Sequence, residues 1–175
     1  MLARWQPRHL APLARLHADP EVMATLGAPL TRTQSDGFAE HQEAGFARAG
    51  YAMWAVERAA DGQFVGAVGL SPVTFAVPFA PTVDVGWRLD RAHWGRGYAT
   101  EAARAALDYG FDVAGREEIV SFTSVGNVRS TAVMERLGLA RQRQGFEHPN
   151  VAPGDPLRPH VLFRIDRAGW AARRS

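Results

Sequence analysis

The order of apolar and polar positions predicts a chain that mixes strands with helices. The segment "TVDVGWRLD", residues 82–90, alternates apolar and polar side chains, which is the period of a strand buried on one face. Gly86 inside this run predicts a bulge or a close backbone neighbour. The segment "YAMWAVERAADGQFVGAVGL", residues 51–70, has two β-type runs around an Ala-Asp-Gly turn and predicts a hairpin. A further strand is predicted in "EEIVSFTS", residues 117–124.

Helical spacing of apolar residues predicts helices over 7–19, 20–26, 33–49 and 99–113, and a last helix that Asn127 caps and Gly138 ends. The helix over 99–113 is unusual because one of its faces carries only small residues. We expect that face to pack closely on a sheet. Its members are Ala99, Ala102, Ala103, Ala106 and Gly110.

The two ends of the chain complete the predicted order of elements. Short strands are expected over 2–5, 139–147 and 160–166, and the Pro/Gly-rich segment 148–159 is long enough to predict a functional loop. Antiparallel-type strands followed by alternating helices and strands indicate an α/β (α+β) fold with a mixed sheet. We see neither an internal repeat nor a linker, so we expect one domain over residues 1–175.

Composition excludes several kinds of chemistry. The 175 residues contain no Lys and no Cys, which rules out a Schiff base, disulfides, thiolate zinc sites and a cysteinyl intermediate, and we expect no metal. The net charge of +2 comes without a block of like charges, so we expect no nucleic acid partner. The chain has neither a signal-peptide pattern nor about 20 consecutive apolar residues, so we expect a cytoplasmic protein and no membrane partner.

One short loop points to anion binding. Gly95 and Gly97 lie between the strand that ends near Asp90 and the helix over 99–113, where free N–H groups and the helix dipole favour a phosphate. Thr100 stands where a dinucleotide fingerprint needs its third glycine, and the absence of Lys excludes a Walker loop. A tight turn without a ligand remains the alternative.

Several segments together resemble the GNAT acyltransferases, and among them the RimJ/RimL-type ribosomal-protein N-terminal acetyltransferases. The segments are "GWRLDRAHWGRGYATEAARAALDYGF", "NVRSTAVMERLGL", "ADPEVMATLGAPLT" and "FEHPNVAPGDPLRPHVLFRI", and the resemblance covers nearly the whole chain. It implies the GNAT fold, in which a mixed, mostly antiparallel sheet has splayed fourth and fifth strands and helices on both faces.

The resemblance also implies acetyl-CoA as a cosubstrate. Its pyrophosphate would lie on the loop N–H groups, and its pantetheine arm would pair with the backbone of Arg88 and Leu89. The implied cofactor-binding residues are Arg88, Leu89, Trp94, Gly95, Arg96, Gly97, Tyr98, Ala99, Thr100, Asn127 and Ser130. Trp94 replaces the usual Gln or Arg of the family motif. The opening strand is shorter than usual, which leaves open whether the chain begins inside it.

The catalytic position shows the most consequential departure from the family pattern. Met134 stands where many GNAT enzymes carry a catalytic Tyr, and Ser130, on the same helical face, is our candidate for assisting the leaving thiolate. Asp84 is the candidate base, since many relatives carry Glu there, although an ordinary solvated aspartate is the other interpretation. Glu147 and His148 are alternatives. We expect His93 on the surface and Trp87 to serve only in packing. The N–H of Leu89 is the implied donor to the carbonyl oxygen.

We therefore expect an acetyl-CoA-dependent N-acetyltransferase that moves the acetyl group directly to a primary amine within a ternary complex. The acceptor can be a protein N-terminus or a small molecule, and the sequence does not decide between them. Whether the protein forms a homodimer is also open. One alternative is a non-catalytic acyl-CoA-binding or sensor module, which the Met134 departure leaves open. The other is a GNAT enzyme that uses a different acyl donor.

Overall fold

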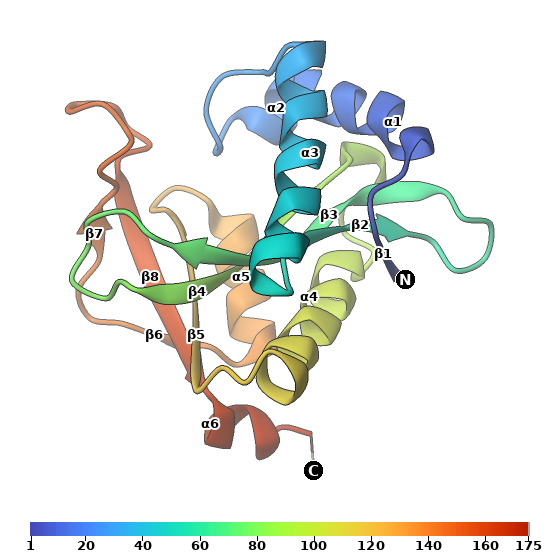
Figure 1. The fold of residues 1–175 in the computed structure, drawn as a ribbon. Helices are drawn as coiled ribbons and strands as arrows, with labels where there is room; N and C mark the ends of the chain where they lie inside the picture. The colour runs from blue at the N-terminus through green and yellow to red at the C-terminus, as the bar shows by residue number, and fades with distance from the viewer. Residues whose placement is uncertain (175) are drawn as a thin grey trace.

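An eight-stranded mixed sheet is the centre of the computed structural model, which describes residues 1–174 (Figure 1). The strand order is β1-β2-β3-β4-β5-β8-β6, with β7 also paired to β8, and only the β4–β5 pair is parallel. The strands are β1 (Leu2–Ala3), β2 (Met53–Glu57), β3 (Phe64–Val73), β4 (Thr82–Leu89), β5 (Glu118–Ser124), β6 (Ala140–Arg141), β7 (Phe146–Glu147) and β8 (Pro159–Asp166).

Helices cover both faces of this sheet, as expected. The helices are α1 (Pro7–Ala18), α2 (Pro20–Met23), α3 (Arg32–Ala49), α4 (Tyr98–Asp108), α5 (Val128–Leu137) and α6 (Arg167–Ala171). Side chains of α1 and α3 meet Arg88 on one face of β4, whereas α5 meets Trp87 on the other face. Since consecutive side chains of a strand point to opposite faces, α5 lies across the sheet from α1 and α3.

The small-residue face of α4 packs against the sheet as the sequence predicts. Ala102, Ala103 and Ala106 are buried, and a Cβ at Gly110 would lie 2.5 Å from Cδ1 of Ile119 on β5. The helix begins one residue earlier than predicted, at Tyr98, and continues beyond Asp108 into a π-helical turn over Tyr109–Val113.

Three sequence-based expectations are wrong in detail, and one helix is not predicted. Residues 139–147 do not form one strand, because their polar run offers no apolar face, and only the short β6 and β7 pair with β8. Gly86 makes no bulge, since β3 and β4 pair in regular register from Gly66–Leu89 to Val73–Thr82. His93, expected on the surface, is buried in a 3-10 turn beside Tyr98. Helix α6 has too few apolar residues to show a helical period and went unpredicted.

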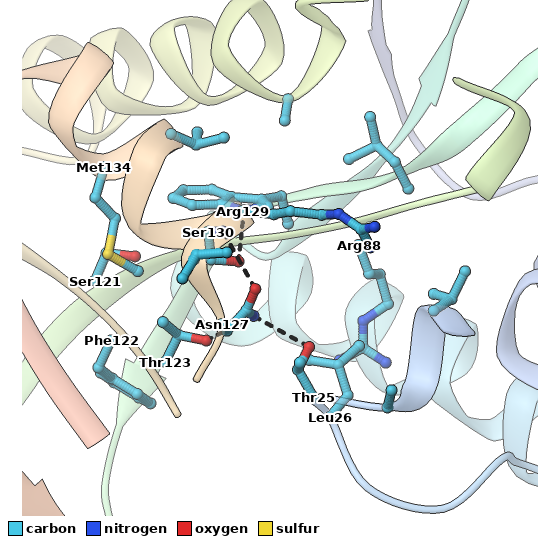
Figure 2. Close-up of a pocket in the computed structure, with 18 of the residues that line it drawn as sticks. Thr25, Leu26, Arg88, Ser121, Phe122, Thr123, Asn127, Arg129, Ser130 and Met134 are labelled. Atoms are coloured by element: carbon cyan, nitrogen blue, oxygen red, sulfur yellow. Dashed lines mark hydrogen bonds between the residues drawn. The ribbon is translucent and has the colours of Figure 1, made fainter. Parts of the chain in front are cut away.

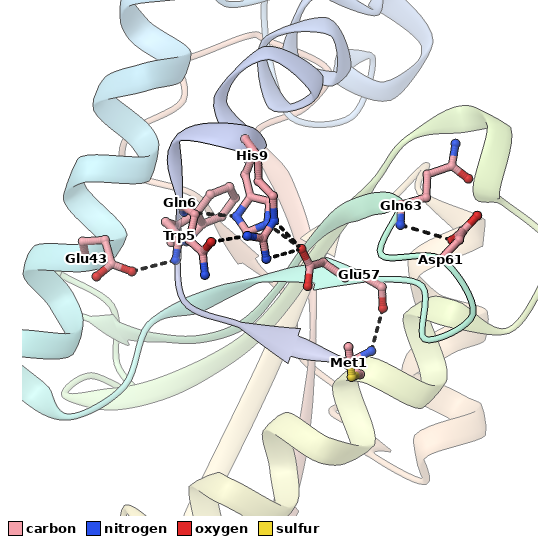
Figure 3. A network of polar contacts seen from close by, with 9 residues as sticks. Met1, Trp5, Gln6, His9, Glu43, Glu57, Asp61 and Gln63 are labelled. Atoms are coloured by element: carbon pink, nitrogen blue, oxygen red, sulfur yellow. Dashed lines mark hydrogen bonds and ion pairs between the residues drawn. The ribbon is translucent and has the colours of Figure 1, made fainter.

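The N-terminal segment is tied to β2 by a network of polar contacts around Glu57 (Figure 3). The N-terminal ammonium donates to the Glu57 carbonyl (2.6 Å), and the Glu57 carboxylate accepts from His9 Nε2 (2.8 Å) and Arg8 Nε (3.0 Å). His9 Nδ1 accepts from the Gln6 backbone, so the ring proton lies on Nε2. These contacts lower the pKa of Glu57, and His9 supplies the largest part of the shift.

The sheet separates between its two central strands. β4 and β5 pair at one position, Asp84 opposite Val120, and beyond it the two strands diverge toward their C-terminal ends. The sequence-based expectation that these strands splay is therefore confirmed.

Candidate active site

A cleft of about 1320 Å³ occupies the gap between β4 and β5 and extends to both sides of it. One end is formed by the loop before α4 and the first turn of α5. The other end lies between the loop after α2 and the long loop before β8. A single cleft thus connects the predicted phosphate site with a region large enough for a second molecule.

Backbone donors of β4 face this gap. The N–H of Asp90 donates to Val65 on β3, and N–H groups alternate sides along a strand, so those of Trp87 and Leu89 point toward β5. The backbone of Val85, two residues before Trp87, points to the same side, because its carbonyl accepts from the Ser121 hydroxyl on β5 (2.7 Å). Trp87 and Leu89 have no strand residue paired with them on that side, which leaves two donors for a ligand.

The glycine loop is shaped for close approach to α4. Gly95 (φ +73°) and Gly97 (φ +85°) both adopt the left-handed conformation, and the positions of their missing Cβ atoms face open space. Gly97 is also the N-cap of α4, so the free N–H groups of the first helical turn follow it directly. The Trp94 indole donates to the Leu89 carbonyl (2.9 Å), and the Arg129 guanidinium lies 4.3 Å over its ring.

The start of α5 holds Ser130 in the cleft (Figure 2). Asn127 caps the helix with its side-chain oxygen on the Ser130 N–H (3.2 Å), and its amide group donates to Thr123 (2.8 Å) and Thr25 (3.1 Å). The Ser130 hydroxyl oxygen accepts from the Trp87 indole (3.3 Å). Within residues 1–174 the hydroxyl proton has no hydrogen-bond acceptor, so it is available to a ligand.

Asp84 lies at the point where β4 and β5 part. Its Oδ1 is buried and has no hydrogen-bond partner within the described part of the chain. Burial raises the pKa of the carboxyl group to about 8, and a hydrogen bond with the Phe122 backbone offsets the rise only in part. The alternative of an ordinary solvated aspartate is therefore wrong.

Aromatic and imidazole rings line the far end of the cleft. Phe122 on β5 lies near His148 and His160, whose ring centroids are 4.9 Å apart. Burial lowers the pKa of both histidines. The rings thus form an aromatic wall at this end of the cleft, and their nitrogen atoms add donors and acceptors to it.

The cleft brings together nearly all of the predicted site residues. Its lining includes Asp84, Arg88, Leu89, Trp94, Gly95, Gly97, Tyr98, Ala99, Thr100, Asn127 and Ser130. Arg96 is exposed and does not line the cleft, and neither does Glu147, which pairs with Arg158 (3.0 Å). Met134, where the resemblance to the family leads us to expect a catalytic Tyr, is buried and lines the cleft.

Sequence reasoning missed three contributors to the site. Thr25 accepts from Asn127 across 102 positions of the chain, and no local pattern indicates such a contact. Thr123 is only four residues before Asn127, but the two are joined across the turn between β5 and α5, which the sequence does not reveal. Trp87 was expected only to pack, although its alternation with Arg88 already places it on the face that α5 covers. Residues 1–174 contain no group of three potential metal ligands and no helix that is long and apolar enough to cross a membrane.

The sequence model described as "Acetyltransferase (GNAT) domain" matches residues 1–140. The chain belongs to the GNAT acetyltransferase family. FsC-acetyl coenzyme A-N(2)-transacetylase of Aspergillus fumigatus is 30% identical over 163 residues, which are 89% of this chain and 68% of that one. An acetyltransferase structure from Agrobacterium tumefaciens superposes with a TM-score of 0.75 at 26% identity, covering 95% of this chain and 90% of that one.

A spermidine N-acetyltransferase from Vibrio cholerae, solved with CoA and spermine, shares the fold, with a TM-score of 0.77 at 17% identity over 98% and 97% of the two chains. GNAT enzymes acetylate amines with acetyl-CoA. The GNAT chain described here is therefore an acyltransferase that uses acetyl-CoA.

Proposed function

We propose that this enzyme transfers the acetyl group of acetyl-CoA directly to the primary amine of an acceptor, within a ternary complex, and that it belongs to the RimJ/RimL-type branch. The names of its relatives favour a small-molecule acceptor, because one is an FsC N(2)-transacetylase and another a spermidine N-acetyltransferase. The assay below also includes peptides with free N-termini, so that a protein N-terminus is tested as the acceptor.

The observation that carries the proposal is the continuity of the cleft. It leads from the glycine loop along the free N–H groups of Trp87 and Leu89 to the hydroxyl of Ser130 and the carboxyl of Asp84. The loop and the first turn of α4 would hold the pyrophosphate of acetyl-CoA, and the gap in the sheet would hold its pantetheine arm. Arg96 would contribute only as an exposed charge near the loop.

Each catalytic requirement has a candidate group. Asp84 accepts a proton from the amine, whose neutral form is the nucleophile, and a pKa raised to about 8 makes its carboxylate a stronger base than that of an ordinary aspartate. The Leu89 N–H donates to the carbonyl oxygen, where negative charge develops. Ser130 donates its hydroxyl proton toward the leaving sulfur, since that proton has no acceptor within the described residues and the Trp87 indole fixes the position of the oxygen.

A free-thiol assay with a panel of amines tests the proposal. The panel holds amino acids, polyamines, aminoglycosides and short peptides with free N-termini, and mass spectrometry identifies the acetylated product. We expect thiol release that depends on the amine and a product with one acetyl group on nitrogen. No thiol release with any amine, while acetyl-CoA binds, would instead favour the non-catalytic module. Thiol release without an acetylated amine would show thioester hydrolysis and would contradict transfer to an amine. Faster turnover with a longer acyl-CoA would favour a different donor.

Direct transfer has its own test. The protein incubated with acetyl-CoA alone should gain no acetyl group on a cleft residue, because the chain has no Cys to carry one. An adduct that forms and decays at the turnover rate would contradict direct transfer.

A further inference from the structure

The side chain of Arg88 extends into the cleft and forms no ion pair with any carboxylate of residues 1–174. Its Nη1 donates to Nε2 of His17 (3.0 Å), and its guanidinium lies 4.5 Å over the Phe38 ring. Figure 2 shows the side chain turned toward Thr25 and Leu26 of the loop after α2. Apart from these two contacts, the guanidinium is left to face the cleft.

The neighbours of Arg88 do not neutralise its charge. An arginine has only donors, so His17 Nε2 accepts, and its Nδ1 proton goes to the Ser35 hydroxyl (2.8 Å). Burial, with the Arg88 charge second, lowers the pKa of His17 to about 4, so this ring is neutral at physiological pH. His17 therefore orients the guanidinium without supplying a counter-charge.

Three arginines line the cleft, and Arg129 and Arg136 are exposed to solvent, whereas Arg88 is largely desolvated. Several arginines elsewhere in the chain pair with acids. Arg91 pairs with Glu21 (2.6 Å), and Arg164 pairs with Glu118 (2.6 Å). A desolvated cation is costly unless an anion accompanies it, and burial lowers the pKa of Arg88 to about 10. A guanidinium also presents four further N–H donors in a geometry that matches the two oxygens of a carboxylate.

The strand relates this cation to the candidate base. Asp84 and Arg88 point to the same face of β4, four residues or about 13 Å apart along the strand. Gly86 stands between them and has no side chain to fill the space above the sheet. Along this face of β4, the carboxyl group of Asp84 and the guanidinium of Arg88 are thus separated by the uncovered backbone at Gly86.

We propose that Arg88 binds a carboxylate of the acceptor, so that the enzyme acetylates amines that also carry an acidic group. This inference rests on the proposed N-acetyltransferase function and names the class of its acceptor. It also separates this enzyme from polyamine acetyltransferases, because a polycation placed beside Arg88 would be repelled.

The test compares acceptors that differ only in the anion. Glycine, β-alanine, 4-aminobutyrate and L-phenylalanine are each assayed against their own primary amides, with ethanolamine phosphate and spermidine as further arms. We expect the wild type to prefer the acids over the amides by about 10–100-fold in kcat/KM, the range of one charge-assisted contact. A preference for the phosphate over every carboxylate, or for spermidine, would overturn the assignment.

Two variants locate the preference at this side chain. Arg88→Met should lower the acid-to-amide ratio to about 1, whereas Arg88→Lys should keep part of it. Arg48→Met, at an exposed position on α3, is the matched control and should keep the wild-type ratio. A ratio of two substrates measured on one preparation does not depend on how much of the variant is folded.

The remaining outcomes separate failure of this inference from failure of the proposed function. If wild type acetylates amides as fast as acids, the carboxylate assignment is wrong while the N-acetyltransferase function stands. If Arg88→Met keeps the preference but raises the KM for acetyl-CoA, Arg88 binds a cofactor phosphate instead and the inference is wrong. If no amine is acetylated at all, the proposed function fails and this inference fails with it.

Discussion

At the scale of single residues, two hydrogen bonds fix the position of Ser130. Its hydroxyl oxygen accepts from the Trp87 indole, and its backbone N–H donates to the side-chain oxygen of Asn127. The hydroxyl proton has no acceptor within residues 1–174 and is therefore available to a ligand. A tyrosine at position 134 would deliver its hydroxyl from one helical turn further along. Met134 is instead buried and fills that space.

Replacing Ser130 by Ala should lower kcat and kcat/KM together by about 10²-fold, because the lost contact matters chiefly in the transition state. Trp87→Phe should lower both by less, and the double variant should be no slower than Ser130→Ala alone, because the two groups act as a pair. Steady-state kinetics with an acceptor from the panel measures this. A Ser130→Ala enzyme at the wild-type rate would leave Ser130 with a purely structural role.

Asp84 should give the enzyme a distinct pH profile. If its carboxylate is the base, kcat/KM rises with pH up to about 8, the value to which burial raises the pKa, and then levels off. Asp84→Asn should be at least 10²-fold slower and should lose that inflection. A profile that keeps the same inflection in Asp84→Asn would transfer the role to another group, with His148 next to be replaced.

The same substitution should stabilise the protein. The pKa of Asp84 is higher in the folded state than its ordinary value of 3.8, so folding favours the protonated form and stability falls as pH rises from about 4 to about 8. Because Asn carries no charge, its stability does not fall over this pH range. The Tm of Asp84→Asn should therefore be higher than that of wild type at pH 8 and should approach it at pH 4.

At the scale of elements, the loop before α4 depends on two left-handed glycines. Gly97→Ala should weaken acetyl-CoA binding about 10-fold or more, because a side chain strains φ +85° and turns the N–H groups of the loop. Gly115→Ala carries a similar strain at φ +65° in open space beyond α4, and serves as the control. Calorimetry should show weaker binding in the first variant alone. Equal affinities in both would place the pyrophosphate elsewhere.

Elements with a strong local period could be predicted from the sequence, and those without one could not. β4 and α4 carry a clear alternation and a small-residue stripe, and both form close to the predicted bounds. β6 and β7 exist only because β8 offers them backbone partners, and nothing in "RQRQG" indicates that pairing.

The candidate site follows the same rule. The glycine loop and the cap at Asn127 are local motifs, so their places in the cleft could be predicted. The burial of Asp84 depends on β5 lying beside it, and the isolation of Arg88 depends on His17 and Phe38, which are far away in sequence. Both properties arise from packing between distant segments and have no local signal.

At the scale of the whole molecule, the first 10 residues are joined to the sheet through Glu57. The partners of this carboxylate are the side chains of His9 and Arg8, both from the N-terminal segment. Glu57→Gln should lower the free energy of unfolding by about 1–2 kcal/mol at pH 7, because two charge-assisted contacts are lost.

The pH dependence checks the origin of that loss. The pKa of Glu57 is lowered in the folded state, so its contribution is present above the ordinary value of 4.5 and disappears as pH falls through the folded value. Denaturant titrations should show wild type and Glu57→Gln converging below pH 4. Glu40→Gln, at an exposed position of α3, should match wild type at every pH. A constant difference at all pH values would assign the loss to packing.

The single pair between Asp84 and Val120 has a mechanical consequence. It divides the sheet into two halves, one of β1 to β4 and the other of β5 with β8 and its partners. Because the ladder hydrogen bonds lie inside each half, the width of the gap depends on contacts outside the ladders. These are the bond from the Ser121 hydroxyl to the Val85 carbonyl and the turn at Gly110, which lies against Leu70 of β3 and Ile119 of β5. A larger side chain at Gly110 would therefore press on both halves and change the width of the cleft without touching a residue that lines it.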